Sequence, residues 1–493
     1  MRSPGRWPDG AWFLVGAALR LLWHADFLFK HDEARNLEFS LGIAREGRWV
    51  SHAWLTSVGI PAGPVPAYFF AAITRFTTDP LVANLAVALV NIAALAAAAP
   101  LYRRLLPRRE DARLAFVLHA TSPMAIWFSR KIWDQCLLSM FTVPALWIAA
   151  VAVERRSWII GLLPPLLAIA AQTHHAGFFF AVVLLAALLV RPRAIDWRAF
   201  ALGCVAAAVI AAPYGAHLAR TVFLAEDAPP LRSISRYPDI DVVTNLLLDA
   251  SGHNILDAAG RDAVPLLSWP VWPLGLLVIL AGLPFYACLV AGYAEAARSG
   301  GGARRLLLTL GLGLPLLYLA LRVRGVAHYF LPIFPILFAL TALGARRLRE
   351  ARSPRWRLAA PPAGPLAAVN VATWILFATY IQAHWGGESY GLPYRRLVGA
   401  CEAVAAEAAA RGLGTAETPL RLCVDTWRER SLLPTQYAYV LERRLGVRVE
   451  PPASAEEADL VLEVRWPRGG RLRAPPYIIR GVAESVESDP AVD

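Results

Sequence analysis

The chain has 493 residues, of which 57% are hydrophobic and only 17% are charged. This composition lies outside the usual range of soluble proteins and indicates a membrane protein. The net charge of +12 would suggest a nucleic-acid partner in a soluble protein, but the arginines gather in short segments between apolar runs. That arrangement is typical of membrane topology, so we expect no nucleic-acid partner.

Apolar segments recur along the first four-fifths of the chain, and most are long enough to cross a bilayer as helices. The predicted fold class is therefore a polytopic α-helical membrane protein with about eleven transmembrane helices. The predicted spans lie near residues 11–28, 81–101, 114–129, 133–153, 158–173, 176–190, 198–215, 270–294, 305–321, 328–345 and 366–384. A short apolar segment at 64–76 is predicted to lie as a helix at the membrane interface.

Every even-numbered span is followed by a cluster of arginines, for example 103–113 and 346–357. Because basic loops stay in the cytoplasm, this alternation predicts a cytoplasmic N-terminus. The loops 29–80 and 216–269 and the C-terminal tail are then expected on the outer face of a bacterial cytoplasmic membrane.

The last hundred residues change character. A helical pattern at 395–411 is followed by strand-like runs at 420–424, 447–449 and 460–464, with a further helix near 433–445. This alternation predicts a small extracytoplasmic α/β domain at 386–493, after a membrane domain at 1–385. Cys401 and Cys423 fall in it and could pair in an oxidising compartment.

Two adjacent acids, Asp32 and Glu33, follow the first span and face outward in this topology. A charged group at the edge of the bilayer is costly unless it is hydrated, paired or functional. Neighbouring helical residues point about 100° apart, so one acid can face a reacting centre while the other ties the loop down. The alternative is that Asp32 simply caps a helix that ends at Gly47.

A second cluster, Arg130 and Lys131, forms an outward basic pair in the turn between spans three and four. Most basic residues lie inward, so these two are candidates for binding a phosphate. The alternative is an ion pair between Arg130 and Asp134 at the start of a helix.

A third group comprises His174, His175, His328 and Tyr329, in two other outward turns. Histidines at an interface are usually ordinary amphipathic residues. No recognised spacing of metal ligands is present, although the Asp239–Asp241 triplet could supply oxygen ligands to Mg²⁺ or Mn²⁺.

No nucleotide-binding signature is visible, and an outward site lacks a supply of nucleotides. The natural activated substrate is a lipid phosphate. Group transfer from it needs a carboxylate that accepts the proton of the acceptor hydroxyl, cations for the departing phosphate, and an apolar groove.

The chain resembles the membrane glycosyltransferases of the GT-C superfamily, especially glycosyltransferase family 39, the protein O-mannosyltransferases, the aminoarabinose transferase acting on lipid A and the Rgt-type transferases. The likeness covers roughly residues 10–345. It is carried by segments 18–34, 122–130, 173–177 and 328–335, in the order and spacing of the family. His328 stands where relatives often have arginine, and the residues after Arg130 also differ.

The resemblance implies transfer of a sugar from a polyprenyl-phosphate donor to an envelope glycan, lipid or protein, with Asp32 as the catalytic base and Glu33 as its partner acid. Arg130, Lys131, His174, His175, His328 and Tyr329 are the expected contacts of the donor head. Two alternatives stay open, a lipid-linked sugar flippase and a catalytically inactive assembly subunit.

Overall fold

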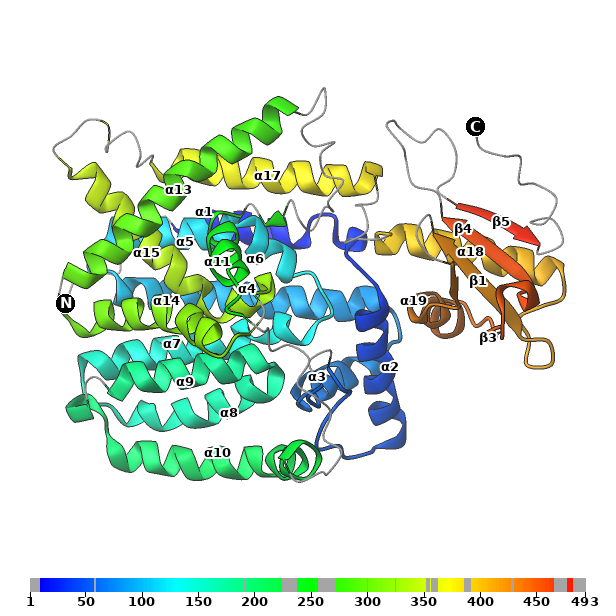
Figure 1. The fold of residues 1–493 in the computed structure, drawn as a ribbon, viewed down its shortest axis with the longest axis horizontal. Helices are drawn as coiled ribbons and strands as arrows, with labels where there is room; N and C mark the ends of the chain where they lie inside the picture. The colour runs from blue at the N-terminus through cyan, green and yellow to red at the C-terminus, as the bar shows by residue number, and fades with distance from the viewer. Residues whose placement is uncertain are drawn as a thin grey trace.

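A computed structural model describes residues 9–56, 59–189, 192–223, 237–252, 254–255, 272–298, 300–323, 325–351, 355, 362–384, 392–426, 430–464 and 477–481. The molecule is a bundle of helices with a C-terminal α/β region beyond one end, on the side of helices α2 and α3 (Figure 1). Parts of the predicted loop 216–269, with its residues 224–236, 253 and 256–269, lie outside the described residues.

A helix lies at each of the eleven predicted spans. They are α1 (Asp9–Leu21), α4 (Pro80–Leu105), α5 (Arg109–Thr121), α7 (Ser139–Glu154), α8 (Leu163–Thr173), α9 (His175–Leu189), α10 (Trp197–Leu218), α13 (Trp272–Arg298), α14 (Gly302–Ala320), α15 (Phe334–Arg349) and α17 (Ala363–His384). In the described part of the chain, five helical segments are long and apolar enough to cross a membrane. The molecule is thus a multi-pass membrane protein, and the count of eleven spans stays a prediction.

The third predicted span is interrupted near its C-terminal end. Ser122 accepts a hydrogen bond from the backbone N–H of Ala125 at 3.3 Å, and Pro123 occupies the first position of the next helix, α6 (Pro123–Phe128). Proline fits there because the first helical turn needs no N–H donor. After α6 the chain turns through residues 129–133 into a short 3₁₀ helix, η2 (Asp134–Leu137), so the predicted basic pair lies in this turn.

The first loop contains two helices, α2 (His31–Glu46) and α3 (Val65–Thr74). The α2 helix ends at Gly47, as predicted, where φ is +63° and glycine avoids the strain that a side chain would add. The alternative that Asp32 caps α2 is wrong, because Lys30 is the N-cap residue. Asp32 therefore lies within the first turn, where the positive end of the helix dipole stabilises its negative carboxylate.

Close backbone contact joins α13 and α15 in the middle of the bundle. A Cβ atom at Gly344 would lie 1.7 Å from the carbonyl oxygen of Cys288, and one at Gly292 would lie 1.9 Å from that of Leu340. Small residues at such crossings allow membrane helices to pack tightly where the hydrophobic effect cannot drive association. This helix pair fixes the position of the segment before α15, η7 (Ala327–Ile333), which carries His328 and Tyr329.

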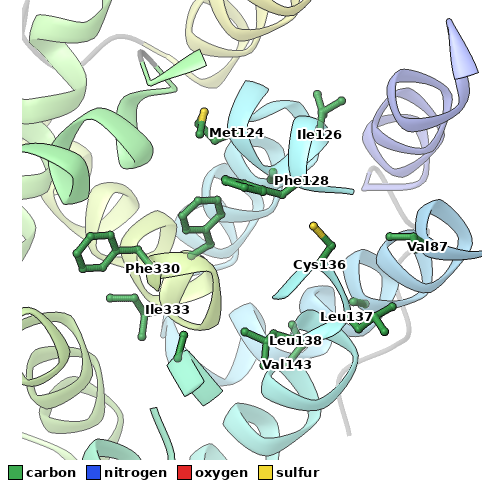
Figure 2. Packing of buried hydrophobic residues seen from close by; sticks show 14 of the residues in the cluster. Val87, Met124, Ile126, Phe128, Cys136, Leu137, Leu138, Val143, Phe330 and Ile333 are labelled. Atoms are coloured by element: carbon green, nitrogen blue, oxygen red, sulfur yellow. The ribbon is translucent and has the colours of Figure 1, made fainter. Parts of the chain in front are cut away.

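A buried apolar cluster lies where α6, η2 and η7 meet. Figure 2 shows the cluster, with side chains from all three segments. Phe128 is 3% exposed, and Phe330 and Ile333 are fully buried. Tight packing of this kind leaves little freedom for the three segments to move relative to one another.

The arginine end of the bundle, where α4, α7, α13 and α15 finish, carries a network of ion pairs. Glu295 accepts from Arg304 and Arg346 at 3.2 Å and from Arg347 at 2.9 Å. Arg346 also pairs with the buried Asp111 at 3.3 Å. Further pairs join Arg104 to Glu154 and Arg108 to Glu350.

The C-terminal α/β region begins with α18 (Tyr394–Ala410) and contains α19 (Thr435–Tyr439) and a π-helix, η8 (Val440–Arg444). Its strands are β1 (Leu420–Thr426), β2 (Arg430–Leu432), β3 (Val449–Glu450), β4 (Leu460–Val464) and β5 (Tyr477–Gly481). The sheet has the order β2-β1-β4-β5, with β1 and β4 parallel in the register Leu422–Leu460, and β3 also pairs with β1. The predicted strands and helices are therefore present.

The disulfide considered from the sequence is not formed. Cys401 and Cys423 are thiols, and they lie in two different apolar clusters. Cys401 packs into the main core with α18, whereas Cys423 on β1 packs beside Ala458 and Val461.

The C-terminal region touches the first loop directly. The backbone N–H of Tyr394 donates to the carbonyl of Phe27 at 2.9 Å, and the Tyr439 hydroxyl donates to the carbonyl of Thr78 at 3.0 Å. Arg443 on η8 pairs with Glu38 on α2. The helix that carries the two predicted acids is therefore held from both sides, by the bundle and by the C-terminal region.

Candidate active site

The start of α2 places its two acids differently. Glu33 is fully buried, and its Oε2 atom accepts a hydrogen bond from the backbone N–H of Lys30 at 3.0 Å. Its Oε1 atom is buried and has no hydrogen-bond partner among the described residues. Asp32 is 55% exposed and pairs with Arg35 at 3.1 Å. One acid thus ties down the start of the helix, and the other faces the solvent-accessible side.

Lys131 lies beneath this helix start and is only 1% exposed. Its ammonium group lies 3.2 Å from the ring centre of Trp133 and 4.1 Å from that of Trp127. The turn is held against α2 because the side-chain amide of Asn36 donates to the carbonyl of Ile132 at 2.8 Å. A cation between two indole faces is stabilised by the electrons of the rings, which offsets part of the cost of its burial.

Glu33 and Lys131 also act on each other through space. Burial raises the pKa of Glu33, and the Lys131 ammonium opposes that rise. Burial lowers the pKa of Lys131, and Glu33 opposes that fall. The two opposite charges are both removed from water and partly compensate each other. An anion that binds beside Lys131 would therefore change the protonation of Glu33.

Asp134, at the start of η2, is a third acid near α2. It is half-buried, and burial raises its pKa to about 7, with the charge of Asp32 adding to the rise and that of Arg35 opposing it. The sequence suggested only that Asp134 could orient Arg130. The charges of Asp32 and Arg35 both act on it, so it lies near the start of α2 and is a further candidate for the site.

The predicted histidines and tyrosine come together on the other side of the lysine. The rings of His174 and His175 are 3.8 Å apart between centres, and His328 lies 5.6 Å from His174. Tyr329 lies 4.8 Å from both His175 and His328. Trp133 connects the group to the lysine, because its ring lies 5.9 Å from that of His328. Three turns that are far apart in the sequence therefore meet at one place.

Arg130 turns away from this cluster. Its guanidinium group donates to the carbonyl of Trp23 and lies 5.3 Å from the ring centre of Trp374 on α17. The side chain is 4% exposed. The structure therefore places Arg130 where it joins the end of α1 to α17, and places Lys131, its neighbour in sequence, in the site.

The Asp239–Asp241 triplet serves a structural purpose in this conformation. The Oδ1 atom of Asp239 accepts from the backbone N–H of Asp241 at 3.0 Å, and its Oδ2 atom accepts from that of Gly325 at 2.9 Å. Both carboxylate oxygens thus connect α11 (Asp241–Ser251) to the segment before η7. Across the ranges that the structure describes, no group of three His, Cys, Asp or Glu side chains is arranged to hold a metal ion.

Several polar atoms of the site are unsatisfied. The indole N–H groups of Trp127 and Trp133, His175 Nε2 and Glu33 Oε1 are all buried and lack a hydrogen-bond partner among the residues described, as do further atoms elsewhere in the bundle. Buried polar groups are nearly always paired in folded proteins, so each of these four atoms is available to a ligand. The two tryptophans were not predicted as site residues, and their only sequence signal is their spacing on either side of Lys131.

No protein-family model matches the sequence, and no curated protein matches it. The fold does have solved counterparts. The crystal structure of ArnT from Cupriavidus metallidurans bound to undecaprenyl phosphate matches with a TM-score of 0.60 and 14% identity, over 98% of this chain and 100% of that chain. The apo state of ArnT matches with a TM-score of 0.58 and 14% identity, over 92% of each chain.

The oligosaccharyltransferase of Archaeoglobus fulgidus tethered to an acceptor peptide gives a TM-score of 0.48 at 14% identity, over 91% of this chain and 64% of that chain. The fold of this protein is therefore the fold of the two ArnT structures. The resemblance expected from the sequence motifs is therefore confirmed at the level of the fold.

Proposed function

We propose that this protein is a membrane glycosyltransferase that moves a sugar from a polyprenyl-phosphate donor to an acceptor of the cell envelope. The fold supports this proposal, because the ArnT structure that it matches over its full length contains undecaprenyl phosphate. The site supports it as well, because the exposed carboxylate of Asp32 acts electrostatically on the buried cation of Lys131.

The reaction assigns separate tasks to the two sides of the site. Asp32 accepts the proton of the acceptor hydroxyl as the oxygen attacks the anomeric carbon. The bond between that carbon and the phosphate oxygen breaks, and its electron pair stays on the departing lipid phosphate. Lys131 stabilises the charge that develops there. Attack from the side opposite the phosphate inverts the anomeric configuration.

The remaining predicted residues surround these two. Glu33 fixes the start of α2 and balances the charge of Lys131, and His174, His175, His328 and Tyr329 line the donor head. Arg130 acts indirectly, by holding the turn that carries Lys131.

We propose that the site lies on the outer face of the cytoplasmic membrane, with the N-terminus in the cytoplasm. The arginine end of the bundle is then cytoplasmic, in agreement with the preference of basic residues for that side. The loops 29–80 and 216–269 and the α/β domain at 386–493 face the acceptor. The lipid donor reaches the site through the bilayer.

One observation carries the proposal, the exposed Asp32 above the buried pair of Glu33 and Lys131. Asp32→Asn removes the base with little change in shape, so transfer should fall by roughly 100-fold or more. Glu46→Gln on the last turn of the same helix, which pairs with Arg48 at 3.7 Å, is the matched control and should stay fully active.

The measurement is mass spectrometry of envelope glycans and glycolipids from cells that lack the protein or carry each variant at equal membrane levels. Full product with Asp32→Asn would contradict the role of Asp32. Lipid translocation by reconstituted vesicles that contain no acceptor would instead favour a flippase.

A further inference from the structure

The Lys131 ammonium group is enclosed by two indole rings rather than by an ion pair alone. Its distances of 3.2 Å and 4.1 Å to the ring centres of Trp133 and Trp127 place it in contact with both faces. Since Nε1 is an atom of each ring, both indole N–H groups lie close to the ammonium. We call these three residues the lysine cage.

The N–H groups of the cage have no use within the described protein. Both Nε1 atoms are buried, and neither has a hydrogen-bond partner among the residues that the structure describes. A buried tryptophan usually finds an acceptor for its N–H. Two donors without an acceptor beside one cation indicate that the acceptor belongs to a ligand.

The chemistry of the donors selects the class of ligand. An ammonium and two indole N–H groups can donate to several oxygens of one anion, and a phosphate offers more acceptor oxygens than a carboxylate. The surroundings are also apolar, with Phe128 5.9 Å from the ammonium between ring centre and nitrogen. A phosphate that carries a lipid chain suits this combination better than a free inorganic ion.

We propose that Trp127 and Trp133 donate their indole N–H groups to the oxygens of the lipid phosphate held by Lys131, forming a three-donor cage for the leaving group. This inference rests on the proposed function. As the sugar leaves, negative charge grows on the phosphate, and donors already fixed in place stabilise that charge without reorganisation. Trp127 and Trp133 would therefore be binding residues as well as packing residues.

Titratable groups around the cage bear on its affinity for an anion. Glu33 and Asp32 on α2 and Lys30 just before it act on the charge of Lys131, and so do Cys136 on η2 and His328 on η7. Glu33 opposes the entry of an anion unless it gains a proton. The indole donors are uncharged, so they strengthen phosphate binding without adding to the buried charge.

The test separates the N–H group from the ring. Trp127→Phe and Trp133→Phe keep an aromatic face for Lys131 but remove the donor, whereas Trp127→Leu and Trp133→Leu remove both. Purified full-length protein in detergent is titrated with undecaprenyl phosphate and with undecaprenol, and binding is measured by native mass spectrometry. Trp158, which is 70% exposed on η3 (Trp158–Leu162), provides the control variant Trp158→Phe.

Each Phe variant should bind undecaprenyl phosphate at least roughly tenfold more weakly than the wild type, as expected for a lost hydrogen bond to a charged group. Affinity for undecaprenol and the thermal unfolding midpoint should change little, and Trp158→Phe should behave as the wild type.

Unchanged phosphate affinity in both Phe variants, with losses only in the Leu variants, would overturn the proposal, because the rings would then act only through their faces. If the wild-type protein bound undecaprenol as tightly as undecaprenyl phosphate, the protein would not recognise the phosphate. That result would contradict the proposed function as well as the role of the cage. The two failures are therefore distinguishable.

Discussion

The two ends of the helix bundle treat their charges in opposite ways. At the arginine end, Glu295 binds three arginines, and the buried Asp111 has Arg346 beside it. At the site end, Lys131 is buried between indole rings, and Glu33 keeps one carboxylate oxygen without a hydrogen-bond partner among the described residues.

The difference separates charges that stabilise the fold from charges kept for a ligand. A charge removed from water destabilises the protein unless partners replace its hydration. Within the described part of the chain, the arginine end compensates its charges with ion pairs within the protein, although Asp111 Oδ2 and Arg346 Nε make no hydrogen bond there, whereas the site end leaves neutral indole donors and one Glu33 oxygen unused. Functional sites commonly reduce stability in this way, so the contrast supports the placement of the site.

Two substitutions with opposite expected results test this contrast. Lys131→Met removes the buried cation and fills its volume, so transfer should fall by roughly 100-fold or more. The thermal stability of the same variant should change little, because Glu33, which loses its cation, can take up a proton, as the rise of its pKa on burial already favours. Sugar transfer in membranes and thermal unfolding in detergent measure the two effects.

Glu295→Gln at the arginine end is the counterpart. It leaves three arginines around a neutral amide, so the free energy of unfolding should fall by about 1–3 kcal/mol. Transfer per folded molecule should stay at the wild-type level. If both variants lost stability and activity together, the distinction between the two ends would not hold.

The sequence predicted the helices well because the apolar runs that define them are local. The outward turns with His174, His175, His328 and Tyr329 were predicted as one group from the family resemblance, and the structure does bring them together. Their role stays a prediction. These turns lie at the same end of the bundle because of the order in which the helices follow one another, and that order can be predicted from the sequence.

The sequence could not separate Arg130 from Lys131. Both are basic, adjacent and expected to be outward, and the direction of Arg130 depends on Trp23 and Trp374, which lie far away in the chain. The same reason explains why Trp127, Trp133 and Asp134 were missed. Their environment is created by three turns that meet only in the folded protein.

The contact between the C-terminal region and α2 offers a second comparison, between a held and a released site helix. Thr435 on α19 lies within hydrogen-bond distance, 2.8 Å, of His31 beside Asp32, and the Nε atom of Arg443 donates to Glu38 at 3.1 Å. These contacts join residues about four hundred positions apart. We expect these contacts to position α2 and therefore Asp32. Small displacements of a catalytic base reduce the rate strongly, so loss of the contacts should lower transfer.

Charge reversal tests this expectation. Glu38→Arg or Arg443→Glu should each lower transfer by roughly three- to thirtyfold, and the double variant should recover much of the loss because the pair is restored in reverse. Arg421→Glu, which breaks the pair with Asp459 at 2.7 Å in the same region, should leave transfer unchanged. Equal losses in all of these variants would indicate general damage to the C-terminal region instead.

The smallest expected effect concerns pH. Burial raises the pKa of Asp134 to about 7, above its value in the unfolded chain, so the folded state holds a proton that the unfolded state releases. The stabilisation from this carboxyl is complete below about pH 4, and it is lost as the pH rises towards 7. Asp134→Asn cannot ionise, so its stability relative to the wild type should be greater at pH 8 than at pH 5.

Asp459 provides the control with the opposite sign. Arg421 holds the pKa of Asp459 below its usual range, so this carboxylate is ionised throughout pH 5 to 8 and Asp459→Asn should change stability equally at both values. Thermal unfolding midpoints of the wild type and both variants at the two pH values make the comparison. The same pH dependence in both variants would show that Asp134 is hydrated and ionised in the folded protein. Asp134 would then not belong to the buried part of the site near Asp32.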